Sequence, residues 1–137
     1  MRDMKRTVAD IMNRNLLYLA DGSRTELARD PILKFGVTAV PVLDEEGRPV
    51  GVVSLRDLLR DDPPHHATSP AFSIVATTSV EAAARALAET DYHHLVVVDE
   101  KSGRAVGMVS SADLLRALLD MPPRHPGAFP AFRGGAK

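Results

Sequence analysis

Two short stretches of this chain carry the residues best placed for chemistry. Residues 51–57 read GVVSLRD and residues 107–113 read GMVSSAD, so each stretch has an aspartate three residues after a serine. The apolar residues before each serine are typical of a buried strand, and the leucines that follow are typical of a short helix. Because the pattern occurs twice, the chain is predicted to consist of two copies of one structural unit.

Serine and aspartate at this spacing have two uses. In a capping box, the serine hydroxyl accepts a hydrogen bond from the aspartate amide, and the carboxylate accepts one from the serine amide. In a ligand site, the start of the helix suits a phosphate, and an acidic side chain accepts hydrogen bonds from ribose hydroxyls. The sequence leaves both uses open for all four residues, which are Ser54, Asp57, Ser110 and Asp113.

The two copies differ at the residue before the aspartate, which is Arg56 in the first copy and Ala112 in the second. A guanidinium forms strong, charge-assisted hydrogen bonds with phosphate oxygens. Arg56 is therefore either an anion ligand or a solvated surface residue. If only one copy holds a phosphorylated ligand, the sequence favours the copy with Arg56.

Composition narrows the class of protein. The 137 residues carry a net charge of −1, so the charge balance does not favour nucleic acid or an anionic membrane as the partner. The absence of cysteine excludes disulfides and thiol chemistry. No apolar run approaches the ~20 residues that span a bilayer, and the charged N-terminal residues do not resemble a secretory signal. We expect a cytoplasmic protein.

Motifs of catalysis and metal binding are absent from the sequence. It contains no GxSxG motif, no P-loop and no GxGxxG motif. The histidine pairs at 65–66 and 93–94 lack the spacing of zinc ligands. We therefore expect neither an enzyme nor a metal site.

The pattern of apolar residues predicts the same order of elements in both copies. That order is strand, helix, strand, strand, helix, which places the chain in the α/β (α+β) class as two pseudo-symmetric β-α-β-β-α repeats. Strands are predicted over 16–20, 38–43, 48–53, 72–76, 94–99 and 104–109, and helices over 7–12, 23–34, 79–90, 111–120 and from residue 54. We expect the repeats over 7–60 and 72–120, a linker over 61–71 and a Pro/Gly-rich tail over 121–137.

Local signals predict where some helices begin and end. Ser23 with Glu26, and Thr78 with Glu81, have the spacing of capping boxes. Ser79 is a second N-cap candidate beside Thr78. Pro31 lies inside the first of these helices and predicts a kink or a restart there. Gly36 is a candidate left-handed cap at the C-terminal end of that helix.

Three groups of residues resemble a known family. Residues 7–12 (TVADIM), 36–44 with 51–57, and 93–99 with 107–113 look like the motifs of a tandem pair of CBS (cystathionine-beta-synthase) domains, known as a Bateman module. The resemblance covers roughly residues 7 to 120. It implies two repeats packed through their sheets, with two clefts between them.

The resemblance also implies a function and partners. Many such modules bind adenine nucleotides such as AMP, ADP or ATP, and some bind S-adenosylmethionine or a cyclic dinucleotide. Two modules commonly pair through their helices into a disc-shaped homodimer. The implied role is a regulatory energy or metabolite sensor that signals to an effector protein, which the sequence does not identify.

The family's binding residues carry over to specific positions. Asp57 and Asp113 would hold ribose, and Ser54 and Ser110 would face phosphates. The edges of the adenine slots would come from residues 38–41 (Thr38, Ala39, Val40 and Pro41) and 92–95, which include His93 and His94.

The aligned positions Ala39 and His94 differ in size. Ala39 leaves room for a base, whereas His94 would fill the slot or stack on the base. The second cleft is thus predicted to depart from the easiest adenine site at both Ala112 and His94, which makes the cleft with Arg56 the better site. The alternative is a ligand-free interaction or dimerisation module of the same fold. In that case Ser54, Asp57, Ser110 and Asp113 only cap helices.

Overall fold

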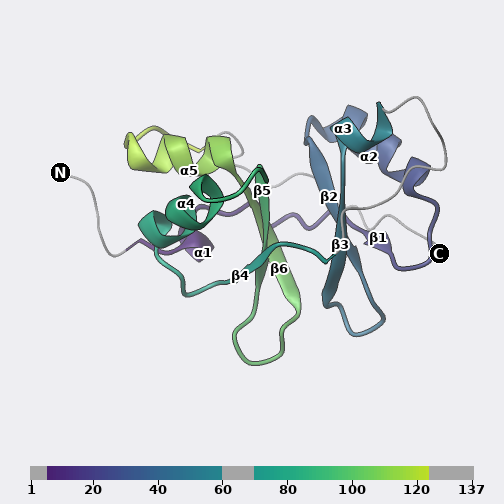
Figure 1. Cartoon of the computed structure of the whole chain (residues 1–137), viewed down its shortest axis with the longest axis horizontal. Coiled ribbons are helices and arrows are strands. Elements are labelled where there is room, and N and C mark those ends of the chain that lie inside the picture. Colours follow the sequence, from purple (N-terminus) through teal and green to yellow (C-terminus); the bar gives the residue numbers. More distant parts are fainter. Residues whose placement is uncertain (1–5, 60–69, 124–137) are drawn as a thin grey trace.

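The computed structural model describes residues 6–59 and 70–123. Most of the predicted linker and tail lies outside these residues, as do the histidine pair at 65–66 and the two tail phenylalanines at 129 and 132. The described part contains two three-stranded sheets with the same order and polarity (Figure 1).

The first sheet has the order β1 (Leu19–Ala20), β2 (Ala39–Leu43) and β3 (Pro49–Ser54). The second has the order β4 (Ser73–Val75), β5 (His94–Val98) and β6 (Ala105–Ser110). In each sheet the first two strands are parallel and the last two are antiparallel. The predicted pair of β-α-β-β-α repeats is confirmed.

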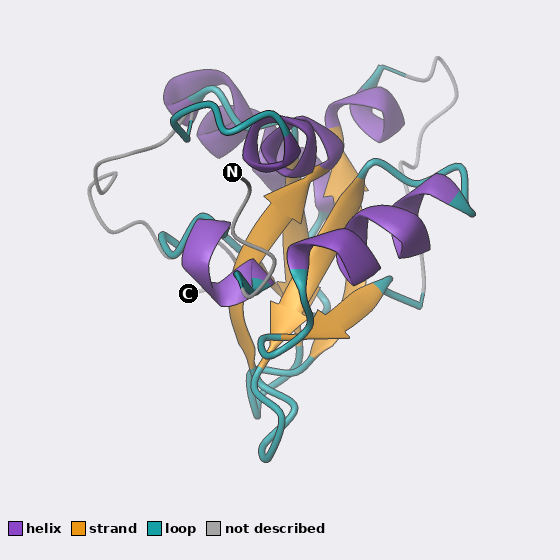
Figure 2. Ribbon diagram, turned by 90° about the vertical axis from the view of Figure 1, so that its left-hand side faces the viewer, coloured by secondary structure: helices purple, strands orange, loops and turns teal. Residues whose placement is uncertain are grey.

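Helices lie on the outer face of each sheet. Repeat 1 contributes the 3₁₀ helix η1 (Thr25–Ala28), α2 (Arg29–Phe35) and α3 (Leu55–Leu58). Repeat 2 contributes α4 (Val80–Ala88) and α5 (Ser111–Leu118). In the view of Figure 2, the hairpin loops extend from one end of the strands, away from these helices.

The inner faces of the two sheets meet in a shared apolar layer. Along β5, Leu95 and Val97 pack in the cluster beneath α4 and α5, while Val96 packs between the sheets against Ala39 and Val52. Successive side chains of a strand point to opposite faces, so the unbroken apolar run of β5 serves both layers.

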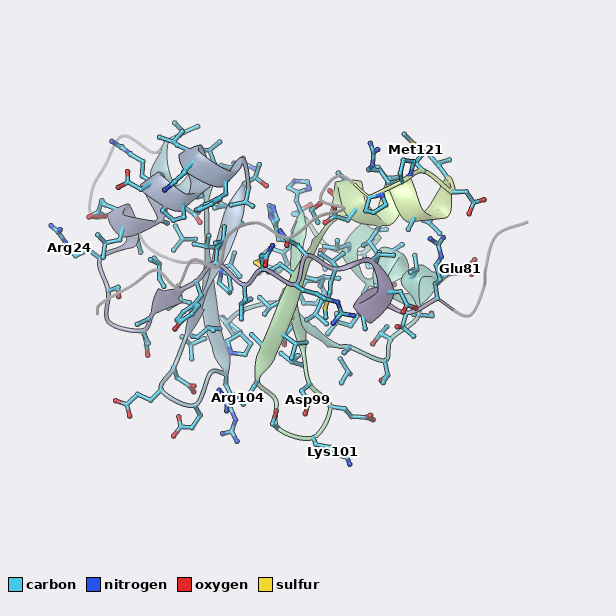
Figure 3. All side chains as sticks on the ribbon, turned by 180° about the vertical axis from the view of Figure 1, so that it is seen from behind. Arg24, Glu81, Asp99, Lys101, Arg104 and Met121 are labelled. Carbon is cyan, nitrogen blue, oxygen red and sulfur yellow. The ribbon has the colours of Figure 1, made fainter. Side chains whose placement is uncertain are left out.

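The hairpins of the two repeats touch at the end of the sheets opposite the starts of β2 and β5. The Ala105 amide donates to the Gly47 carbonyl at 2.8 Å, and Arg48 Nε donates to the Ser102 carbonyl at 3.2 Å. Asp99, Lys101 and Arg104 lie around this hairpin end (Figure 3). The repeats are therefore held together at one end by loop contacts, which leaves the other end for clefts.

Residues 6–13 pack on repeat 2, although they precede repeat 1 in the sequence. The short helix α1 (Val8–Ile11) places the fully buried Val8 in the core of repeat 2, and Asn13 pairs with Met108 of β6. A Cβ at Gly107 would lie 2.6 Å from the Met12 sulfur, so only glycine admits this crossing segment. The sequence pattern gave no sign that the segment belongs with the distant repeat.

Two predicted capping boxes are wrong. The first helical turn of repeat 1 is η1, whose N-cap Arg24 makes no side-chain cap bond, and Ser23 Oγ is buried with no partner among the described residues. The predicted restart is confirmed, because α2 begins at Arg29 and so holds Pro31 in its first turn, where proline does not break an intrahelical hydrogen bond. Gly36, with φ of 68°, ends α2 in the left-handed conformation, as predicted.

In repeat 2 the second of the two predicted N-cap candidates begins the helix, so the capping box of Thr78 with Glu81 does not form. Ser79, not Thr78, is the N-cap of α4, and its hydroxyl accepts a hydrogen bond from the Ala82 amide at 3.1 Å. Both Thr78 and Ser79 have side chains suited to an N-cap. A tertiary contact fixes the backbone here, because the Thr78 carbonyl accepts a hydrogen bond from the Val8 amide of the crossing segment at 2.8 Å.

Candidate functional site

The capping use of the serine–aspartate pairs is realised in both repeats. Ser54 Oγ accepts from the Asp57 amide at 3.1 Å, and Asp57 Oδ2 accepts from the Ser54 amide at 2.8 Å. The same bonds join Ser110 and Asp113 at 3.2 and 2.8 Å. The two strand-to-helix corners therefore have matching geometry, and any ligand role for these residues is added to their role as caps.

The helix starts offer fewer amides to a phosphate than the sequence suggested. The Leu55 amide donates to the Thr38 carbonyl at 2.8 Å, and the equivalent Ser111 amide donates to the His93 carbonyl at 2.9 Å. Together with the capping bonds, these contacts occupy three amides at each corner. The exposed guanidinium of Arg56 is thus the group at the first corner best suited to an anion.

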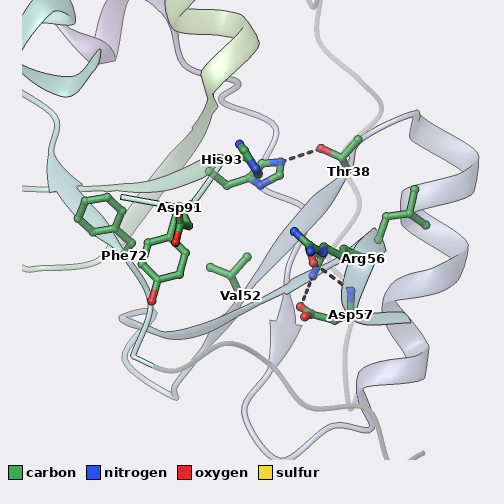
Figure 4. A pocket seen from close by; sticks show the side chains of 11 residues that line it. Thr38, Val52, Arg56, Asp57, Phe72, Asp91 and His93 are labelled. Carbon is green, nitrogen blue, oxygen red and sulfur yellow. Dashed lines mark hydrogen bonds between the residues drawn. The ribbon is translucent and has the colours of Figure 1, made fainter. Parts of the chain in front are cut away.

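A cavity of about 310 Å³ lies between the first corner and repeat 2 (Figure 4). We call it the Arg56 cleft. Repeat 1 supplies its polar corner, and repeat 2 supplies the segment before β5 together with Phe72. The lining residues are Thr38, Val52, Ser54, Leu55, Arg56, Asp57, Phe72, Asp91, Tyr92, His93 and His94.

The Arg56 cleft has an aromatic wall facing a polar corner. The rings of Phe72 and Tyr92 lie side by side with their centroids 5.5 Å apart. Figure 4 shows Phe72 on one side of Val52, with Arg56 and Asp57 on the other. A flat aromatic ring can stack on such a wall while attached polar groups reach the corner.

A second, smaller cavity of about 60 Å³ lies at the other corner. We call it the Asp113 cleft. Here repeat 2 supplies the corner, and repeat 1 supplies the segment before and at the start of β2. The lining residues are Asn13, Gly36, Val37, Thr38, Ala39, His94, Met108, Val109, Ser110 and Asp113.

The structure corrects the predicted composition of the clefts. The sequence predicts Ala39 in the Arg56 cleft and His93 and His94 in the other. Instead, Ala39 lines the Asp113 cleft and His93 lines the Arg56 cleft, whereas His94 lines both clefts. Each cleft therefore combines the corner of one repeat with the strand start of the other, because the sheets pack face to face.

Two predicted site residues line neither described cavity. Val40 and Pro41 are buried within β2, with Val40 in the core of repeat 1. Conversely, Phe72, Asp91 and Met108 line the clefts but are not among the predicted site residues. An aromatic residue just before β4 was the only available signal for Phe72, and nothing in the pattern linked Asn13 to a cleft.

His94 stands between the two clefts and lines both. Its Nε2 lies 2.6 Å from Thr38 Oγ1, a hydrogen bond between the repeats that Figure 4 draws. Burial, followed by the neighbouring His93, lowers the pKa of the His94 imidazole, while Asp113 acts in the opposite direction. The lowered pKa favours a neutral imidazole at neutral pH.

The described residues contain no cluster of three or more side chains suited to a metal ion. Nor does any helix in 6–59 or 70–123 have the length and apolar character to cross a membrane.

The fold and its clefts define a class: paired α/β repeats that enclose cavities between their sheets. The chain belongs to the CBS domain family, whose model matches residues 8–63 and 66–120. Over 81 residues it is 44% identical to the magnesium transporter MgtE of Thermus thermophilus, a match that covers 56% of this chain and 18% of the transporter. This chain thus spans only a small part of that relative.

Solved structures of CBS pairs share the fold. The CBS-pair protein CBSX2 of Arabidopsis thaliana is 28% identical, with a TM-score of 0.70 over 83% of this chain and 94% of that one. CBSX2 has also been solved in complex with AMP, with a TM-score of 0.68 and coverage of 83% and 96%. The CBS domain pair of protein MJ0100, in complex with 5′-methylthioadenosine and S-adenosyl-L-methionine, has a TM-score of 0.74 at 21% identity, covering 84% of this chain and 97% of that one.

Proposed function

We propose that this chain is a regulatory module that binds an adenosine-containing nucleotide of the AMP, ADP or ATP type in the Arg56 cleft. The observation that carries the proposal is the cavity of about 310 Å³ that brings Arg56 and Asp57 together with the Phe72–Tyr92 wall. The AMP complex of the related CBSX2 supports the ligand class.

Each part of the ligand has a matching part of the cleft. The adenine stacks on the wall formed by Phe72 and Tyr92, and the ribose hydroxyls reach the carboxylate of Asp57. The phosphate meets the Arg56 guanidinium and the Ser54 hydroxyl, which line the same side. S-adenosylmethionine and cyclic dinucleotides are weaker candidates, because the cationic sulfur of the first is poorly matched to Arg56 and the second is larger than one nucleotide.

The signal is a shift in population. A ligand that contacts both repeats favours the arrangement in which the cleft is closed around it, and its differential affinity sets the size of the shift. An effector protein that recognises one arrangement then responds to the nucleotide, which makes the module an energy or metabolite sensor in the cytoplasm.

Thermal unfolding with AMP, ADP, ATP, S-adenosylmethionine and a cyclic dinucleotide tests this function. A nucleotide at 100 times its Kd adds about 2.7 kcal/mol to the free energy of unfolding. An increase in Tm with an adenine nucleotide is the expected result. If none of the five changes Tm, the alternative of a ligand-free interaction module replaces the sensor.

The helices carry a second expected activity, homodimerisation. Four leucines on or next to these helices are more than half exposed. They are Leu33 of α2 (70%), Leu59 just after α3 (72%), Leu115 of α5 (59%) and Leu119 just after α5 (66%). Helices α2, α3 and α5 lie toward the same end of the two sheets (Figure 1). A second copy of the chain would cover these side chains through its own helices.

Light scattering after gel filtration tests the dimer. The wild type is expected at the mass of two chains, and Leu115→Ser with Leu119→Ser at the mass of one. Lys101→Ser, at the hairpin end, is the control and should leave the mass unchanged. A monomeric wild type would exclude the dimer without affecting the nucleotide proposal.

A further inference from the structure

The two clefts are compared most directly at equivalent positions of the repeats. In the strand registers, Ala39 pairs with Ser54 as His94 pairs with Ser110, and Pro41 pairs with Val52 as Val96 pairs with Met108. Ala39 is thus equivalent to His94, and Val52 is equivalent to Met108. At both positions repeat 2 carries the larger side chain.

His94 and Met108 both take up space in the Asp113 cleft. The imidazole of His94 is held there by its hydrogen bond of 2.6 Å to Thr38. Met108 lines the same cavity, and its backbone exchanges two hydrogen bonds with Asn13, at 2.9 and 3.1 Å, which brings Asn13 into the lining.

The polar corner of the Asp113 cleft is complete despite the lack of room. Its capping box has nearly the same bond lengths as the one at Ser54 and Asp57. What differs is the volume, about 60 Å³ against about 310 Å³. Pockets for small-molecule ligands typically hold roughly 300–1,000 Å³, so only the Arg56 cleft is large enough.

We infer that His94 and Met108 close the Asp113 cleft, so that each chain has one nucleotide site, and that smaller side chains at these positions would create a second. The inference rests on the proposed function, because it concerns how many sites of that kind a chain contains. His94 acts here by its bulk, and its hydrogen bond to Thr38 keeps that bulk in place.

Isothermal titration with AMP, and in parallel with ATP, counts the sites per chain. The wild type should bind one equivalent. The double variant His94→Ala with Met108→Val, which gives repeat 2 the small residues of repeat 1, should bind two. Adding Asp113→Ala to the double variant should return the count to one, which assigns the new site to the Asp113 corner.

Control variants separate bulk from other effects. Met108→Leu keeps a side chain of similar volume at a position outside the Arg56 cleft, and it should still bind one equivalent. His94→Ala and Met108→Val as single variants should each show a second, weaker binding event, so the inference stays testable if the double variant does not fold. Thermal unfolding of each variant confirms that the protein titrated is folded.

The outcomes distinguish this inference from the proposed function. A wild type that binds two equivalents, or variants that all remain at one, overturns the inference and leaves the nucleotide sensor standing. A wild type and variants that bind none of the nucleotides overturn the proposed function, and the inference fails with it.

Discussion

The Arg56 cleft and the Asp113 cleft are built on equivalent strand-to-helix corners, yet they differ as cavities. Both corners have a capping box of the same geometry, and both receive a strand start from the opposite repeat. One corner faces the Phe72–Tyr92 wall across a roomy cavity, whereas the other faces Asn13 and Met108 across a small one. The comparison teaches that the repeated motif gives both corners the same geometry, while the residues around each corner give the two cavities different volumes.

The largest expected difference between the clefts concerns their aspartates. Asp57→Ala should weaken AMP binding about 10- to 100-fold, because hydrogen bonds to a charged group contribute roughly 1.5–3 kcal/mol. Asp113→Ala should leave AMP binding unchanged. Each variant loses the carboxylate bond of its capping box, so Asp113→Ala controls for that loss. Titration calorimetry measures the affinities, and a larger loss for Asp113→Ala would reverse the assignment of the site.

The second expected difference between the clefts is the positive charge of Arg56, which the Asp113 cleft lacks. Arg56→Ala should weaken ATP binding about tenfold and adenosine binding little, since adenosine has no phosphate for the guanidinium to bind. The difference should shrink as salt is raised. The reciprocal change, Ala112→Arg, should add no site while His94 and Met108 fill that cleft. Equal losses for ATP and adenosine would mean that Arg56 acts through structure and not through phosphate.

The aromatic wall is the third difference. Tyr92→Ala should weaken AMP binding roughly 2- to 10-fold, because aromatic pairs contribute about 0.5–1.5 kcal/mol beyond their buried area. Tyr92→Phe keeps the ring and should bind AMP as well as the wild type does. If Tyr92→Phe loses as much affinity as Tyr92→Ala, the hydroxyl and not stacking is responsible.

The smallest expected effect comes from His94. Burial lowers its pKa in the folded state, so the unfolded chain binds more protons at this residue in the range between the two pKa values. The free energy of unfolding should therefore decrease as pH falls below about 6.5, the ordinary value for histidine. His94→Gln should flatten this part of the profile, measured by urea unfolding between pH 8 and pH 5. An unchanged profile would show that His94 does not carry the dependence.

Local patterns predicted the fold well where short-range chemistry decides it. Short apolar runs bounded by turn residues located the six strands of the described part, and Gly36 and Pro31 marked the end and the restart of a helix. The capping box at Ser23 was wrong because several residues nearby could begin a helix, and Pro31 selects the start at Arg29. The candidate site residues at the two corners followed from the repeat, but the cleft to which each strand start belongs did not.

The sequence by itself determined the two repeats, their strand-to-helix corners and the difference between Arg56 and Ala112. These features depend on residues close together in the chain, whose hydrogen bonds and side-chain directions follow local rules. Tertiary structure alone decided that Tyr92 faces Arg56, that Ala39 faces Asp113, and that the segment 6–13 crosses to repeat 2 and brings Asn13 into a cleft. Those placements depend on how the two sheets bury their inner faces against each other. The spacing of residues along the sequence does not indicate that packing.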